Sequence, residues 1–202
     1  MPRIAILASH EGSVLQAVLD ATQDHSLDAR VNVVISNNSD SGALRRARQA
    51  SVPTAHLSSK THPRPADLDL AIATLLADRQ TNLVLLAGYM KRLGPVTLGE
   101  FAGHIVNTHP SLLPKYGGRG FYGRRVHEAV LANGDAETGA TVHLVEGDYD
   151  SGPILAQARI EVRPDDTVQR LEQRVKCCER DLLLNTLRKL VTEQPTLLKS
   201  TE

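Results

Sequence analysis

Two polar side chains stand two residues apart where an apolar run gives way to prolines, in Asn107-Thr108-His109-Pro110. Residues i and i+2 of an extended segment share a face, so Asn107 and His109 can be directed at one small region of space. Pro110 favours extended backbone angles for the residue before it. An amide and an imidazole so placed can stabilise negative charge on a carbonyl oxygen, although a single histidine near a strand end is more often structural.

An acidic turn forms the second polar cluster, Glu146-Gly147-Asp148-Tyr149-Asp150. In most proteins such a turn is simply solvated. If it folds over His109, however, a carboxylate beside the imidazole favours the protonated ring. The candidate catalytic residues are therefore Asn107, His109 and Asp150, a set suited to the attack of an amine on a carbonyl carbon. His143, in the apolar run before the turn, could serve core packing or support catalysis.

The elements that must position these residues alternate along the first half of the chain. Short apolar runs predict strands at residues 3–8, 31–36, 53–57, 83–87 and 104–107. Amphipathic segments predict helices near 13–22, 42–50, 66–79 and 95–101, with start signals at Ser13, Ser41 and Pro95. This alternation predicts an α/β fold with a doubly wound, mostly parallel sheet that carries helices on both faces.

The pattern changes after Pro114. A helix is predicted near 122–133, and runs at 140–145 and 154–162 could pair as antiparallel strands. A final helix is predicted from about Thr167 to Leu190, capped by Asp166 or Thr167 and with apolar residues at helical spacing, namely Leu171, Val175, Leu182 and Leu183. We expect a single domain over residues 1–190, followed by a frayed tail at 191–202.

Ligands of such a sheet bind beyond the carboxyl ends of the strands, so the loops after residues 8, 36, 87 and 107 matter most. Gly12 and Ser13 precede a predicted helix whose free amide groups could hold a phosphate, although a simple helix cap explains them equally well. The sequence lacks the Gly-x-Gly-x-x-Gly pattern of dinucleotide sites. The loop after residue 87 mixes apolar and cationic side chains.

The composition favours a small substrate. The 202 residues include 41% hydrophobic ones, and 23 Lys and Arg balance 23 Asp and Glu. A balanced charge creates no overall field for nucleic acid or an anionic membrane. Cys177 and Cys178 are adjacent, so they are unsuited to bridging each other or to chelating a metal, which suggests a reducing compartment. With no leader or long apolar span in the sequence, we expect a cytoplasmic protein.

A resemblance to a known family rests on the same residues. The stretch from Asn107 to Tyr116, with His143 and Asp150-Ser151-Gly152-Pro153 after it, resembles the signature of the formyl-folate-dependent transferases. Further matches are Leu15-Gln16-Ala17, Ser36-Asn37, Leu86-Ala87-Gly88-Tyr89-Met90 and Glu179. The resemblance implies a Rossmann-like formyltransferase fold and transfer of a formyl group from 10-formyltetrahydrofolate, without a metal, to the primary amine of glycinamide ribonucleotide in purine synthesis.

The resemblance also implies roles for individual residues. Asn107 would bind the formyl oxygen, His109 would act as general acid, and Asp150 would keep His109 charged. The implied folate contacts are Met90, Lys91, Arg92, Leu93, Gly147 and Asp148, with Arg64 as a candidate for the glutamate tail. The implied acceptor contacts are Gly12 and Ser13 for the phosphate and Glu179 for the ribose. Lys115 and Tyr116 match the signature but could be simple turn residues.

One departure leaves the acceptor open. The family's phosphate loop usually reads Gly-x-Gly-Ser-Asn, whereas this chain has His10-Glu11-Gly12-Ser13-Val14. Glu11 would repel a phosphate unless it points away and His10 assists binding. Otherwise the chain is a paralogue that formylates another primary amine, such as that of an amino sugar nucleotide.

Further alternatives use the same core. A formyl-folate hydrolase would replace the amine with water, but its usual N-terminal regulatory domain is not expected here. Methionyl-tRNA formyltransferase adds a C-terminal tRNA-binding domain, which is not expected in this chain either. A non-catalytic folate- or nucleotide-binding module is a third alternative, which the intact Asn107, His109 and Asp150 disfavour. We expect small-molecule substrates, neither nucleic acid nor membrane as a partner, and leave a homodimer open.

Overall fold

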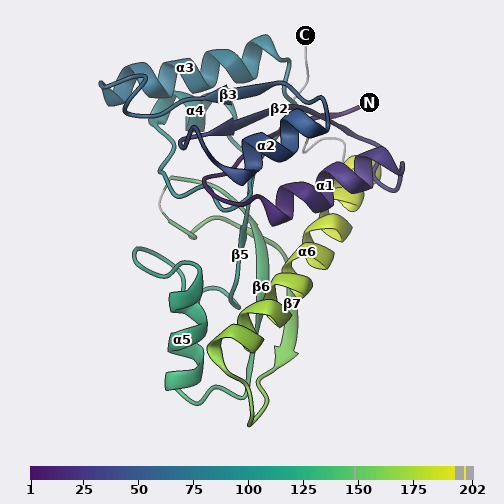
Figure 1. The fold of residues 1–202 in the computed structure, drawn as a ribbon, viewed down its shortest axis with the longest axis vertical. Coiled ribbons are helices and arrows are strands. Elements are labelled where there is room, and N and C mark those ends of the chain that lie inside the picture. Colours follow the sequence, from purple (N-terminus) through teal and green to yellow (C-terminus); the bar gives the residue numbers. More distant parts are fainter. Residues whose placement is uncertain (148, 194–197, 199–202) are drawn as a thin grey trace. The chain divides into compact units, whose positions relative to one another are not determined.

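The computed structural model describes residues 1–147, 149–193 and 198 (Figure 1). Its contacts group into two compact units. The first unit comprises residues 1–106 and the chain from residue 187, and the second comprises residues 107–186. None of the described helices is long and apolar enough to cross a lipid bilayer.

The first unit has the alternating organisation that its sequence predicts. Its strands are β1 (Arg3–Leu7), β2 (Arg30–Ser36), β3 (Thr54–His56) and β4 (Leu83–Leu86). Its helices are α1 (Ser13–Gln23), α2 (Gly42–Gln49), α3 (Pro65–Asp78) and α4 (Pro95–Glu100). Pairing is parallel between β1 and β2, β1 and β4, and β2 and β3. Figure 1 shows α3 on one side of β2 and β3, with α1 and α2 on the other, so the strands are covered on both faces and read as continuous apolar runs.

The helix starts follow local chemistry. Ser41 caps α2 by accepting a hydrogen bond from the Leu44 amide at 3.3 Å, and Pro95 occupies the first turn of α4, as predicted. Ser13 does not cap α1, because the N-cap is Gly12 in a left-handed conformation with φ 72°. The prediction failed because a backbone conformation open to glycine, rather than a side-chain oxygen, begins this helix.

The second unit is built around an antiparallel pair. Strand β5 (Ile105–His109) enters it and is followed by α5 (Arg124–Ala132), β6 (Glu137–Leu144), β7 (Ile154–Glu161) and α6 (Val168–Thr192). β6 and β7 pair antiparallel, as predicted, with a register shift between Val142 and His143. The strand order of the seven-stranded sheet is β3-β2-β1-β4-β5-β6-β7. The predicted doubly wound, mostly parallel α/β sheet with a C-terminal antiparallel pair is therefore confirmed.

The long final helix is also confirmed. Val130 of α5 packs with Leu171 and Val175 of α6 in one buried cluster. Thr167 is the cap, because its hydroxyl accepts from the Arg170 amide at 3.3 Å. Helix α6 continues to Thr192, so the first two residues of the predicted frayed tail are helical; residues 194–197 and 199–202 lie outside the described part of the chain.

Candidate active site

The predicted catalytic residues lie together in the second unit. Asp150 Oδ1 is 3.5 Å from His109 Nδ1, and Asn107 Nδ2 donates to the same oxygen at 3.4 Å. His143 Nε2 is 3.6 Å from that oxygen as well. The side chains of His109 and Asp150 are only 6% and 11% exposed. The carboxylate of Asp150 therefore lies beside the imidazole, as the sequence predicts.

Strand alternation selects the members of this cluster. Strand β5 runs to His109 rather than ending at residue 107, so Asn107 and His109 project from one face of an extended segment. Thr108 projects the other way and donates to Glu179 Oε1 of α6 at 2.8 Å. The period of two thus separates the cluster around Asp150 from a buried Thr108–Glu179 pair.

His143 belongs to the cluster rather than to the apolar core alone. Its Nδ1 lies 2.7 Å from the Leu144 carbonyl, which fits an Nδ1–H donor. Its Nε2 is then free to accept from Asn107 Nδ2, at 3.1 Å. The register shift beside His143 is of the kind that re-aims a side chain next to a functional site. Both N–H groups of the Asn107 amide consequently have an acceptor, one on His143 and one on Asp150.

Backbone groups of the glycine-rich loop complete the cluster. The Tyr116 carbonyl accepts from His109 Nε2 at 2.7 Å, and the Gly118 amide donates to Asp150 Oδ2 at 2.9 Å. An added Cβ at Gly117 would lie 2.6 Å from Leu113 Cδ2, so a side chain there would require the Leu113 side chain to shift. Sequence reasoning missed these contributions, since a backbone carbonyl or amide leaves no signature in residue type.

Burial and charge oppose each other at His109. Burial lowers the pKa of His109, while Asp150 and the Tyr116 carbonyl act to raise it, and the net shift is downward. At Asp150 burial raises the pKa, but the neighbouring His143 and His109 and the Gly118 amide outweigh it, and the net pKa is lowered. The resting cluster therefore combines an ionised Asp150 with a His109 that is easily left neutral at pH 7. Asp150 acts in the direction predicted for it, towards the charged ring, and burial acts against it.

Loops at the carboxyl ends of the strands in the first unit are tied together by Ser9. This residue, 2% exposed, donates to Asn37 Oδ1 at 2.5 Å. Its hydroxyl also accepts from the Met90 amide at 2.7 Å, and its own amide donates to the Gly88 carbonyl at 3.1 Å. The ends of β1 and β2 and the loop after β4 are thus joined through one buried serine, a role that the sequence analysis did not assign.

The loop before α1 is a compact turn against α2. Gly12 packs closely on Ala43: a Cβ added at Gly12 would lie 2.9 Å from the Cα atom of Ala43. Ser13 is exposed in the first turn of α1, where amide groups have no partner within the helix. The carboxylate of Glu11 faces Arg45 at 3.6 Å, and Arg46 Nε donates to the Glu11 carbonyl at 2.8 Å. Glu11 therefore lies over the start of α2.

The remaining predicted contacts fall in both units. After β4, Met90, Lys91 and Arg92 are exposed while Leu93 is buried. Arg64 caps α3 without a side-chain bond to its amides and pairs with Asp67 at 2.6 Å. In the second unit, Gly147 turns with φ 81°, and Asp148 lies outside the described residues. Burial raises the pKa of Glu179, against the bond from Thr108.

The comparisons with known proteins agree on one family. The model of the family described as formyl transferase matches residues 2–187. The chain is 40% identical over 176 residues to phosphoribosylglycinamide formyltransferase of Haemophilus influenzae, covering 87% of this chain and 81% of that protein. It is 38% identical to the trifunctional purine biosynthetic protein adenosine-3 of Bos taurus, of which it spans 18%.

Solved structures give the same result. The crystal structure of glycinamide ribonucleotide transformylase 1 from Symbiobacterium toebii is similar with a TM-score of 0.87 and 37% identity, covering 93% of this chain and 86% of that one. Among the described residues, no group of His, Cys, Asp and Glu side chains is placed to hold a metal ion. With the family model matching nearly the whole length and the expected cluster assembled around Asp150, the chain belongs to the formyl transferase family.

Proposed function

We propose that the protein transfers the formyl group of 10-formyltetrahydrofolate to the primary amine of glycinamide ribonucleotide. The observation that carries this proposal is the convergence of Asn107, His109 and His143 on the Asp150 carboxylate, in a chain of the formyl transferase family. Relatives that carry the name phosphoribosylglycinamide formyltransferase support the choice of acceptor. The reaction belongs to purine biosynthesis.

The lowered pKa of His109 suggests how the protons move. The amine attacks the formyl carbon and forms a tetrahedral intermediate whose nitrogen must lose a proton and whose folate nitrogen N10 must gain one. A neutral His109, whose Nε2–H donates to the Tyr116 carbonyl, can accept the proton from the attacking amine at Nδ1 and then, as an imidazolium, donate it from Nδ1 to N10 as the bond from carbon to N10 breaks. Asp150 and the Tyr116 carbonyl stabilise the imidazolium between these steps, because both favour the protonated ring.

Asn107 is proposed to bind the oxygen of the formyl group as negative charge develops on it. In the structure its amide donates to His143 at 3.1 Å and to Asp150 at 3.4 Å. One N–H must therefore turn to the substrate, and the longer bond to Asp150 is the weaker of the two. His143 then keeps the amide oriented while the other N–H contacts the formyl oxygen.

The binding roles of the other residues are proposed for each unit separately. In the first unit, the segment from Met90 to Leu93 holds the folate, and Arg64 offers a cation for its glutamate tail once it releases Asp67. Gly12 and Ser13 present helix amides to the acceptor phosphate. In the second unit, Gly147 and Asp148 contact the folate and Glu179 contacts the ribose.

The position of Glu11 supports a phosphate-bearing acceptor. The concern raised by the sequence was repulsion between this carboxylate and a phosphate dianion. Because the carboxylate faces Arg45 at 3.6 Å, its charge is compensated and directed to α2. This removes the objection to glycinamide ribonucleotide, and the preference over an amino sugar nucleotide, which also carries phosphate, rests on the names of the relatives.

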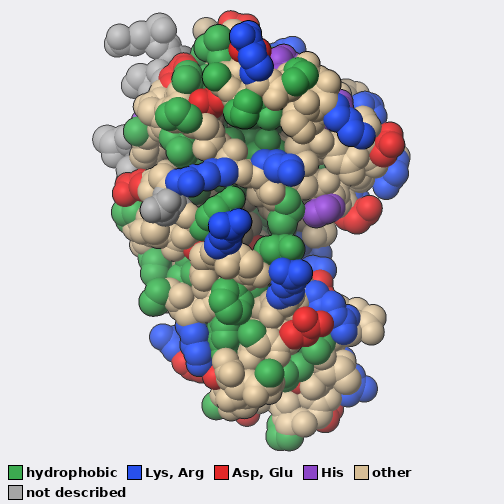
Figure 2. All heavy atoms as spheres, turned by 90° about the vertical axis from the view of Figure 1, so that its left-hand side faces the viewer, with side chains coloured by type: hydrophobic (Ala, Val, Ile, Leu, Met, Phe, Trp, Pro, Cys, Tyr) green, Lys and Arg blue, Asp and Glu red, His purple; other side chains and the backbone are tan. Residues whose placement is uncertain are grey.

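The proposal includes small-molecule partners. Figure 2 shows basic and acidic side chains interspersed with uncharged ones on the face in view, rather than one basic surface of the kind that nucleic acid requires. That nucleic acid is not a partner remains a prediction. Cytoplasmic location, a single formyltransferase domain over residues 1–190 and a homodimer remain predictions.

The function is tested by incubating the purified protein with 10-formyltetrahydrofolate alone, with glycinamide ribonucleotide, or with an amino sugar nucleotide. We expect tetrahydrofolate to form in step with formylated glycinamide ribonucleotide, and only slowly without an amine. Equal release of formate without any amine would identify a hydrolase. Faster turnover with the amino sugar nucleotide would identify the paralogue.

A further inference from the structure

The proposed catalytic histidine is held by a hydrogen bond at one ring nitrogen and faces a carboxylate with the other. His109 Nε2 donates to the Tyr116 carbonyl at 2.7 Å, while Nδ1 faces Asp150 at 3.5 Å. These contacts fix the plane of the imidazole. Because the bond at Nε2 is made to backbone, whatever holds residue 116 in place also decides how the ring faces Asp150.

Tyr116 is held at the far end of its side chain. The hydroxyl donates to Asp135 Oδ2 at 2.7 Å and accepts from Asn133 Nδ2 at 2.7 Å. The ring lies 5.8 Å from that of Phe121, centroid to centroid. Tyr116 has φ 56°, a left-handed conformation that a residue with a side chain keeps only when its surroundings hold it. The contacts of the phenol are such a restraint.

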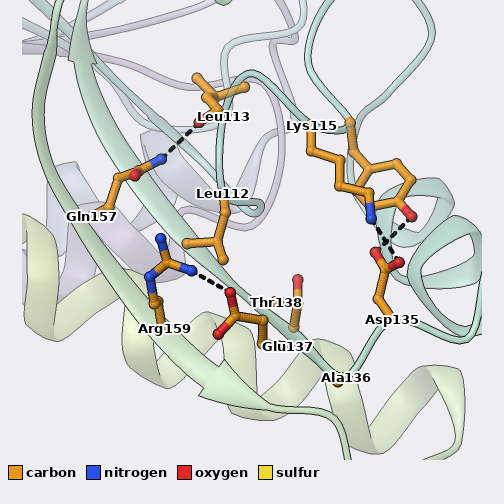
Figure 3. A pocket seen from close by; sticks show the side chains of 10 residues that line it. Leu112, Leu113, Lys115, Asp135, Ala136, Glu137, Thr138, Gln157 and Arg159 are labelled. Carbon is orange, nitrogen blue, oxygen red and sulfur yellow. Dashed lines mark hydrogen bonds and ion pairs between the residues drawn. The ribbon is translucent and has the colours of Figure 1, made fainter.

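Asp135 is well suited to anchor the phenol. It lies in the turn between α5 and β6, and Lys115 Nζ pairs with its Oδ1 at 2.6 Å. Figure 3 shows the ammonium group of Lys115 directed at this carboxylate. The bond from Lys115 lowers the pKa of Asp135, against the raising effect of desolvation, and the bond from Tyr116 lowers it further. The anchor therefore stays ionised and acts as a double acceptor.

The anchor borders a pocket of about 310 Å³, and a second ion pair lines the same pocket (Figure 3). Glu137 and Arg159 form that pair. In the contacts of the described residues, they bond to each other and not to the loop that carries the Tyr116 carbonyl. This pair offers a control on the wall of the same pocket that is not linked to His109, with a carboxylate more exposed than that of Asp135.

We infer that Tyr116 and Asp135 are positioning residues that orient His109 for formyl transfer, Asp135 by fixing the phenol and Tyr116 by presenting its backbone carbonyl. Neither is proposed to touch the substrates. The consequence for the reaction rests on the proposed function, whereas the orientation of the ring is a property of the protein without ligand. The two parts can therefore be measured separately.

The experiment follows the titration of the His109 ring by NMR in the ligand-free protein, with the signal assigned from a His109→Asn spectrum. The variants are Tyr116→Phe, Asp135→Ala and Asp135→Asn, with Glu137→Gln as control. Because the Tyr116 carbonyl favours the protonated ring, we expect the pKa of His109 to fall in Tyr116→Phe and Asp135→Ala. It should stay near the wild-type value in Asp135→Asn, which keeps an acceptor for the phenol, and in Glu137→Gln.

Kinetics supply the second readout. We expect kcat to fall about fivefold or more in Tyr116→Phe and Asp135→Ala, the effect of one lost hydrogen bond, with KM for both substrates changed by less than about twofold. A wild-type titration and wild-type kcat in both variants, each shown to be folded by thermal unfolding, would overturn the inference. If Tyr116→Phe does not fold, the contrast between Asp135→Ala and Asp135→Asn decides in the same way.

Failure of the proposed function has a different signature. A wild-type protein that transfers no formyl group would refute the function, while a shifted His109 titration in the variants would still support the positioning role. Altered KM with unchanged kcat and unchanged titration would instead place Tyr116 and Asp135 in substrate binding and overturn their role at His109.

Discussion

The loops of the first unit and the cluster of the second unit differ in the kind of group that holds them together. Around Ser9, the first unit joins the ends of β1 and β2 and the loop after β4 through neutral groups, namely the Ser9 hydroxyl and amide, the Asn37 side chain and the backbone of Gly88 and Met90. Around Asp150, the second unit uses titratable side chains that are almost completely buried. The contrast suggests a division of labour in which the first set of loops binds and the second set moves protons.

Replacing Asp150 tests the second half of that contrast and should have the largest effect. In Asp150→Asn the charge that stabilises the imidazolium is lost, so kcat should fall by about 10² or more while folate binding changes little. Steady-state kinetics and calorimetry measure both quantities. Asp165→Asn, which removes an exposed carboxylate paired with Arg170, serves as control; a near-normal kcat in Asp150→Asn would remove the carboxylate from the chemistry.

Replacing Ser9 tests the first half. Ser9→Ala leaves the Met90 amide and the Asn37 side chain without their partner, at a cost of about 1–3 kcal/mol. We expect KM for the folate to rise about tenfold or less, with kcat within about threefold. If kcat collapses while KM is unchanged, the first unit takes part in the chemical step and the division of labour is wrong.

The buried titratable residues of the second unit should make the free energy of unfolding depend on pH. The folded pKa of His109 lies below its unfolded value of about 6.5, so the unfolded chain binds more protons and stability is lost as the pH falls below about 6.5. Asp150, with a lowered pKa, adds a second loss only below about pH 4. Urea unfolding from pH 7 to pH 5 should show the first loss.

His109→Asn should reduce the loss of unfolding free energy between pH 7 and pH 5, whereas His25→Asn should leave that loss unchanged. His25 is an exposed residue of the first unit with φ 62°, a conformation that asparagine tolerates. An unchanged loss in His109→Asn would show that burial does not disfavour the charged ring.

The smallest effect is expected at Glu11. In Glu11→Gln, KM for glycinamide ribonucleotide should change by less than about twofold, because Arg45 already compensates an exposed carboxylate. Arg45→Ala should raise KM for glycinamide ribonucleotide more than Glu11→Gln does. In the double variant, KM should return towards the wild-type value. Clear tightening in Glu11→Gln alone would restore the repulsion that the sequence suggested.

Features that depend on residue type could be predicted from the sequence. Asn107, His109 and Asp150 can be recognised in the sequence because their chemistry resides in residue type and, for Asn107 and His109, in the spacing of two that places them on one face of a strand. Ser41 and Pro95 were recognised as helix starts for the same reason. The apolar runs were enough to predict the parallel strands, because strands that are buried on both faces are continuously apolar and show no alternation of polar and apolar residues.

Other features depend on where the chain passes in three dimensions. The Tyr116 carbonyl and the Gly118 amide act through backbone atoms that any residue possesses. Ser9 acquires its role from partners 28 and 81 residues away. The net pKa of His109 depends on burial as much as on Asp150, and burial of a strand end is set by the turn that covers it.

Single-turnover formyl transfer by His109→Ala tests the central claim most directly. Folate and glycinamide ribonucleotide would be held at saturating concentration, with binding checked by calorimetry, so that the measured rate reports the chemical step alone. Loss of the group that moves the proton should slow transfer by about 10² or more, equivalent to about 3 kcal/mol of transition-state stabilisation, with binding retained. A rate within about threefold of wild type would show that the cluster around Asp150 does not carry the reaction.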